Sequence, residues 1–191
     1  MRAHTAVMML LSAAALAWCG MAYTKALDPS GPVSPSELIE MASEALADGN
    51  KPTAIHCIDR YLALADDDTV AAEMAEFWKP TSEQARAVRL VLAERVAALY
   101  EKPAAIKLAG MAYYQALGVP KDYARAMDYL SHPSLAALPE VMFYEADILL
   151  DQGFEGRDEA RGLSLLHQAA DKGYAKAAAR LAELQKAYRY P

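Results

Sequence analysis

The residues that most often hold metals or transfer protons are scattered along this chain. Its four histidines are His4, His56, His132 and His167, and none belongs to a His-x-x-x-His or His-Glu-x-x-His pattern. His167 and Asp171 are four residues apart, a spacing that places them on one helix face as an ordinary surface contact. We therefore expect neither a metal site nor a bound cofactor.

Carboxylates and nucleophiles are dispersed in the same way. Glu140, Glu145 and Asp147 fall on one predicted helix, where charged side chains are normally solvated. The chain contains no glycine-rich phosphate loop, and no Gly-x-Ser-x-Gly or Cys–His nucleophile arrangement. Cys57 lies in an amphipathic helix pattern, where it is expected to be a small core residue. The sequence therefore predicts a binding protein and not an enzyme.

Composition points to helices throughout. Forty-one of the 191 residues are alanine, and Leu, Met, Glu, Lys and Arg supply much of the remainder. These side chains lose little rotamer freedom in a helix, so we expect an all-α protein. The net charge of −6 and the absence of a Lys/Arg stripe exclude an evident nucleic-acid surface.

Start and stop signals divide the chain into short helices. Ser34 with Glu37, and Thr81 with Gln84, form predicted capping boxes, in which two side chains satisfy amides left unpaired by the first turn. Helices are predicted over 36–48, 52–65, 69–78, 82–101, 104–116, 123–131, 138–151, 159–172 and 175–188. The fourth range carries one apolar stripe, made of Val88, Leu92, Val96 and Leu99. Turns this short require antiparallel neighbours, so the helices should form hairpins.

Comparison of the chain with itself at an offset of 36 residues shows an internal repeat. Gly110 falls on Ala146, where a small residue allows another helix to approach closely. Identical residues coincide at three pairs of positions: Asp122 and Asp158, Arg125 and Arg161, and Leu130 and Leu166. Each aspartate begins the second helix of a hairpin, where its carboxylate caps free amides.

These residues resemble the Sel-one-like repeat family, a variant of the tetratricopeptide class with about 36 residues per unit. The first copy carries Leu108-Ala109-Gly110, Tyr113 and Gly118-Val119-Pro120-Lys121-Asp122-Tyr123; the second carries Asp158, Arg161 and 168–173. The copies depart from the family pattern at 131–134 and 152–156, respectively. The resemblance implies an α-solenoid, a right-handed superhelical stack of antiparallel helical hairpins. It covers 102–188. In the N-terminal helical region 34–101, residues 37–65 resemble a plain tetratricopeptide unit more loosely, and 69–101 is either a worn copy or a helical pair that bridges two repeat blocks.

In such a stack the first helix of each hairpin lines a concave face that binds peptides or protein surfaces. The resemblance places eight candidate partner-binding residues there: Lys107, Met111, Tyr114, Gln115, Phe143, Asp147, Leu150 and Asp151. For Met111, Tyr114 and Phe143, which are of types enriched in interface centres, the alternative is packing against the neighbouring hairpin.

The first 22 residues have the features of a signal peptide. Arg2 precedes eighteen uncharged residues, 6–23, and the small side chains of Gly20 and Ala22 favour cleavage after Ala22. An uncleaved signal anchor is the alternative, because eighteen apolar residues just span a bilayer. Cys19 is a candidate for lipidation, although Trp18 occupies a position where lipoproteins carry a small residue. Residues 23–33 form a linker.

Together these features predict an exported scaffold for protein–protein interaction. The family resemblance implies a bacterial envelope protein, periplasmic or attached to the membrane, that binds an envelope or membrane protein in a secretion apparatus, in polysaccharide export or in a regulatory complex. A regulator that restrains a membrane sensor, a cell-wall-active enzyme and a self-assembling structural subunit are the alternatives.

The mass of the N-terminal peptide of the mature protein distinguishes a cleaved signal peptide, a lipoprotein and an uncleaved signal anchor. We expect the fractionated protein to begin at residue 23. A diacylated peptide beginning at Cys19 would instead indicate a lipoprotein, and an intact N-terminal peptide in the membrane fraction would indicate an anchor.

Overall fold

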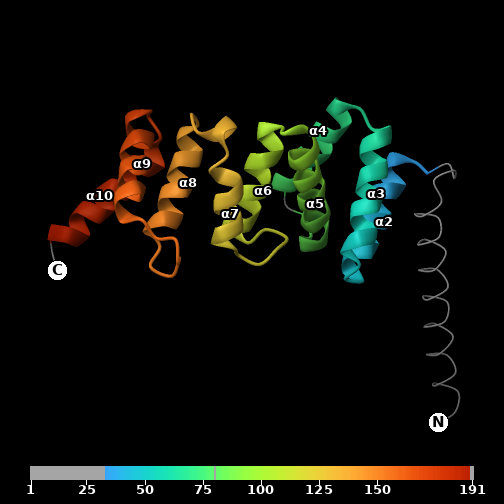
Figure 1. Ribbon diagram of the computed structural model, residues 1–191, viewed down its shortest axis with the longest axis horizontal. Coiled ribbons are helices and arrows are strands. Elements are labelled where there is room, and N and C mark those ends of the chain that lie inside the picture. The colour runs from blue at the N-terminus through green and yellow to red at the C-terminus, as the bar shows by residue number, and fades with distance from the viewer. Residues whose placement is uncertain (1–32, 80, 190–191) are drawn as a thin grey trace, which may run out of the picture. The chain divides into compact units, whose positions relative to one another are not determined.

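The computed structural model describes residues 33–79 and 81–189. All regular structure in these two ranges is helical, and neither contains a strand, so the prediction of an all-α protein is confirmed (Figure 1). The α-helices are α2 (Pro35–Ala47), α3 (Lys51–Leu64), α4 (Asp67–Ala75), α5 (Glu83–Tyr100), α6 (Pro103–Gln115), α7 (Tyr123–Leu130), α8 (Pro139–Leu150), α9 (Glu159–Asp171) and α10 (Ala175–Arg189). Two 3₁₀ turns, η1 (Glu76–Trp78) and η2 (Pro133–Leu135), follow α4 and α7.

No described helix is both long and apolar enough to cross a bilayer. The predicted signal segment 1–22, Cys19 and nearly all of the linker 23–33 lie outside the described residues.

Helix starts follow local capping chemistry. At α2 the backbone N–H of Ser34 donates to Glu37 Oε2 at 2.8 Å, and the Glu37 N–H donates to Ser34 Oγ at 3.3 Å, so this capping box is confirmed. The one predicted at Thr81 is wrong. There the N–H of Ala85 donates to Ser82 Oγ at 3.1 Å, because α5 begins one residue later than the pattern suggested.

The chain divides into two compact units, the first ending at Arg95 and the second beginning at Val96. In the first unit α2 and α3 form a hairpin around buried Leu38 and Ile58. The Arg95 guanidinium, on α5, donates to both carboxylate oxygens of Asp59, on α3, at 2.7 and 3.0 Å. Such a bidentate pair fixes orientation as well as distance.

The apolar stripe predicted on α5 is only partly buried. Val88, Leu92 and Val96 are in the core, whereas Leu99 is 51% exposed. Leu99 lies in the last turn of α5, where the whole stretch 98–100 faces solvent, so burial ends before the helix does.

The second unit contains two hairpins closed in the same way. The N–H of Asp122 donates to Tyr113 O at 3.1 Å in the α6–α7 hairpin, and the N–H of Asp158 donates to Leu149 O at 3.1 Å in the α8–α9 hairpin. Each aspartate then caps its helix, Asp122 Oδ1 accepting from Arg125 N at 2.9 Å and Asp158 Oδ1 from the equivalent amide at 3.0 Å. The 36-residue periodicity thus recurs in the backbone geometry of these two turns.

Small residues set the distance between the helices of each hairpin. A Cβ placed on Gly110 would lie 2.7 Å from Leu130 Cγ, and one on Gly162 would lie 2.9 Å from Leu150 Cγ. Both distances are too short for carbon–carbon contact. The close packing of α7 on α6 and of α9 on α8 therefore depends on these glycines.

Gly110→Ala tests this contact. Alanine favours an isolated helix over glycine by about 1 kcal/mol, yet fully buried Leu130 must move to admit the methyl group. We expect a net loss of about 1–3 kcal/mol in the free energy of unfolding, measured by urea titration followed by circular dichroism. Ala104→Gly, at an exposed position of α6, calibrates helix propensity; a Gly110→Ala protein stabilised by about that amount would show that the close contact is absent.

Candidate protein-binding face

Helices α6 and α8 lie side by side and run parallel. Lys107 Nζ is 3.0 Å from Glu140 Oε2, and the Tyr114 hydroxyl donates to Asp147 Oδ2 at 2.6 Å. Both links join residues 33 positions apart, and they are one heptad apart on each helix. A third link of the same separation joins α8 to α10, with Arg180 Nε 3.7 Å from Asp147 Oδ1. Side chains of α6, α8 and α10 therefore meet on one face of the second unit.

A continuous row of aromatic rings crosses this face. The rings of Tyr123 and Tyr114 are 6.0 Å apart, Tyr114 and Tyr144 4.9 Å, Tyr144 and Phe143 5.2 Å, and Phe143 and Tyr174 5.4 Å between centroids. These five residues are called the aromatic row below. It runs from α6 and the start of α7, over α8, to the residue that precedes α10. Four of its rings are half-buried, and Tyr144 is buried.

The tyrosine hydroxyls of the row are held by neighbours. Burial, followed by the hydrogen bond to Asp147, raises the pKa of Tyr114 far above its usual value. Burial and a hydrogen bond with Tyr174 raise the pKa of Tyr144 in the same direction. Both phenols stay neutral in the physiological range, and these hydrogen bonds fix the positions of their hydroxyls.

Four of the eight predicted binding residues are on this face, and a fifth, Gln115, directly follows Tyr114 in the chain. Tyr114 and Phe143 belong to the aromatic row, and Lys107 and Asp147 form the polar links between helices. Gln115 is exposed at the end of α6.

The other three residues make contacts within the unit. Met111 is 3% exposed, so it packs in the core and offers almost no surface to a partner. Leu150 packs against Gly162 of α9. Asp151 ends α8 and accepts hydrogen bonds from the N–H of Gly153 at 2.8 Å and from the Tyr123 hydroxyl at 3.4 Å.

Sequence comparison at 36 residues missed part of the face for a geometric reason. Tyr114, Tyr144 and Tyr174 are 30 residues apart, so the row cuts diagonally across successive helices and never falls on equivalent repeat positions. Arg180 was missed because its link to Asp147 follows the 33-residue separation. A search for aromatic side chains at 30-residue spacing would have found Tyr114, Tyr144 and Tyr174.

Glu145 contradicts the expectation that the α8 carboxylates are solvated. It is only 7% exposed, and its Oε2 accepts from Arg161 Nη2 at 3.3 Å and from Ser131 Oγ at 3.5 Å. Burial raises the pKa of its carboxyl, while Arg161 and Ser131 act in the opposite direction. Glu145 lies inward because α7 and α9 both pack against α8.

The described residues contain no group of three or more His, Cys, Asp and Glu side chains arranged to hold a metal ion. Cys57 is a buried free thiol, and burial raises its pKa, which lowers the thiolate fraction. What the described face offers chemically is ring surface and paired charges.

Comparison with protein-family models, with curated proteins and with solved structures found no match. The resemblance to Sel-one-like repeats accordingly rests on the residues of this chain alone.

Glu145→Gln tests how much the buried carboxylate charge lowers the free energy of unfolding. When folding raises the pKa of a carboxyl, its protonated form stabilises the fold at pH values below the ordinary pKa of 4.5. This stabilisation is lost as the pH rises through the higher pKa of the folded state. We therefore expect the free energy of unfolding of Glu145→Gln, relative to the parent, to increase between about pH 4 and about pH 7. Urea titrations across this range measure it.

Glu83→Gln, at an exposed position on α5, controls for the loss of one negative charge. A Glu145→Gln protein that loses stability against the parent as the pH rises would contradict the assignment.

Proposed function

We propose that this protein is a helical-repeat scaffold that binds a segment of a protein partner along the face formed by α6, α8 and α10. The observation that carries this proposal is the aromatic row, which runs from α6 over α8 to the start of α10 with four half-buried rings that are already positioned. Aromatic side chains are enriched at the energetic centres of protein interfaces. Rings that are held in place before binding lose little entropy when a partner covers them.

The repeated closure of the hairpins supports a Sel-one-like α-solenoid. In this proposal the two hairpins and α10 are successive elements of a right-handed superhelical stack, and the face carrying the aromatic row is its concave side. The parallel course of α6 and α8 has the sense that such a stack requires.

Charges on this face favour an apolar partner segment. Lys107 is paired with Glu140, and Asp147 accepts from Tyr114 and lies near Arg180. A strongly charged partner would have to compete with these pairs, whereas apolar or aromatic side chains need only cover the rings. Binding by burial of ring surface follows.

The proposed site of action is the bacterial envelope. This part rests on the apolar segment 6–23 and on the family resemblance. The protein would be periplasmic or membrane-attached, and would assemble or regulate a complex such as a secretion apparatus or a polysaccharide exporter.

Photo-crosslinking in the native host tests the binding face. A benzophenone amino acid at Gln115, exposed at the end of α6, should give one adduct of defined mass, whereas the same group at Gln168, exposed on α9, should not. Phe143→Ala should reduce the adduct roughly tenfold, as expected for an interface anchor.

Leu163→Ala truncates a half-buried apolar residue on α9 and serves as the matched control. Circular dichroism checks that both variants fold. Equal labelling from Gln115 and Gln168, or an adduct that survives Phe143→Ala, would rule out the proposed face.

A further inference from the structure

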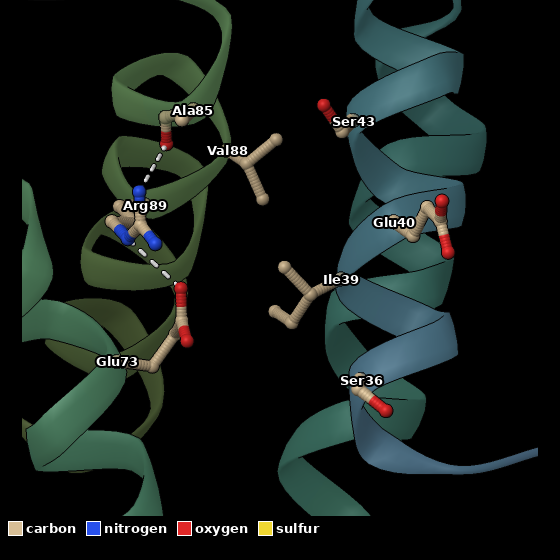
Figure 2. Close-up of a pocket in the computed structure, with 8 residues that line it drawn as sticks. All are labelled: Ser36, Ile39, Glu40, Ser43, Glu73, Ala85, Val88 and Arg89. Carbon is tan, nitrogen blue, oxygen red and sulfur yellow. Dashed lines mark hydrogen bonds and ion pairs between the residues drawn. The ribbon is translucent and has the colours of Figure 1, made fainter. Parts of the chain in front are cut away.

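The first unit contains a groove between α2 and α5, with a volume of about 240 Å³ (Figure 2). Ile39 from α2 and Val88 from α5 point toward one another across it, and Ala85 extends the apolar wall. Ser36 and Ser43 lie along the α2 side. Small-molecule pockets usually measure roughly 300–1,000 Å³, so this open groove better fits one or two side chains of a macromolecular partner.

The walls of the groove are held in place. Gln84 Nε2 donates to the carbonyl oxygen of Ser43 at 3.2 Å, which links α5 to α2. On the other side Arg89 Nε lies 2.8 Å from Glu73 Oε1, which links α5 to α4, and Arg89 Nη1 lies 3.5 Å from the carbonyl of Ala85 (Figure 2). Because both links are made in the free protein, the groove does not have to be assembled on binding.

Negative charge is concentrated in the unit that holds the groove. Residues 33–95 contain twelve Asp and Glu against six Lys and Arg, whereas residues 96–191 contain twelve against eleven. Helices α2 and α4 carry six carboxylates and no Lys or Arg: Glu37, Glu40, Glu44, Asp67, Asp68 and Glu73.

Two charged side chains that line the groove, Arg89 and Glu40, differ in whether they have an ion-pair partner. Arg89 is already paired with Glu73. Glu40, exposed at the α2 rim, makes no hydrogen bond or ion pair with any described residue. The groove therefore has an apolar floor and one unpaired carboxylate on its α2 side, in a unit with excess negative charge, so its electrostatic complement is a basic segment.

We propose that this groove binds a basic amphipathic helix of a protein partner. The helix would seat one aliphatic side chain between Ile39 and Val88 and place Lys or Arg beside Glu40, the helix-in-groove mode of recognition. This surface belongs to the first unit and uses none of the residues of the aromatic row, so it stands or falls independently of the function proposed above.

Fluorescence anisotropy with designed peptides and the full-length protein tests this inference. The probe is a fluorescein-labelled fourteen-residue peptide with Leu on one helical face and Lys elsewhere. Its counterparts are the same peptide with Glu in place of Lys, and a Leu/Lys peptide of identical composition whose order destroys the apolar face. We expect the amphipathic Leu/Lys peptide to bind at least about tenfold more tightly than either counterpart, and more weakly as salt is added.

Two groove variants and two matched controls locate the site. Glu40→Lys and Ile39→Ala should each weaken binding by roughly five- to tenfold. Asp128→Lys makes the same charge reversal at an exposed position of α7, and Ile55→Ala the same truncation at a half-buried position of α3; both should leave affinity within about twofold.

Three outcomes would overturn the inference: no binding of the amphipathic probe, equal binding of the rearranged peptide, or an Asp128→Lys effect as large as that of Glu40→Lys. The second and third would reduce the effect to general charge attraction. Crosslinking at Gln115 is unaffected by any of these results, so the two proposals can fail separately.

Discussion

The close approach of the two helices in each hairpin is the constraint on which the second unit depends. Gly110 lets Leu130 of α7 rest on the backbone of α6, and Gly162 lets Leu150 of α8 rest on α9. With a side chain at either glycine the second helix would be displaced, and the hydrogen bonds that close the two turns would lose their geometry. Because α7 and α9 are fixed in this way, α6 and α8 come into lateral reach of one another.

Because α6 and α8 are neighbours, their side chains meet on one face of the second unit. The polar links join residues 33 positions apart, and the tyrosines are 30 positions apart. Both separations are shorter than the 36-residue repeat, because long side chains of one helix contact residues that lie before the equivalent position in the parallel helix of the next hairpin. Tyr114 takes part in both patterns, since its ring contacts Tyr144 and its hydroxyl donates to Asp147. The same contacts that join successive helices also hold the rings in position.

The two units differ in the character of their surfaces. The second unit is nearly neutral, with ion pairs that link α8 to α6, α9 and α10, and with its aromatic rings grouped. The first unit holds an excess of carboxylates around a groove floored by Ile39 and Val88. The two proposed partner segments differ accordingly: one would be recognised through ring contact, the other through charge and a single aliphatic anchor.

Sequence alone determined the helices and the repeat. Apart from 69–78, which runs past the end of α4 at Ala75 into η1, the predicted ranges lie within one residue of the observed ends. Alanine-rich helices, prolines at first turns and capping residues such as Ser34 act locally. The Asp122 and Asp158 caps could also be predicted from the sequence, because the free amides of a helix N-terminus need a hydrogen-bond acceptor whatever the tertiary fold. Tertiary structure decided what local pattern does not contain: the burial of Glu145 between α7 and α9, the inward position of Met111, the diagonal course of the aromatic row, and the groove in the first unit. Each arises from residues distant in sequence that become neighbours only when hairpins pack, and the periodicity of one helix carries no information about its neighbour's register.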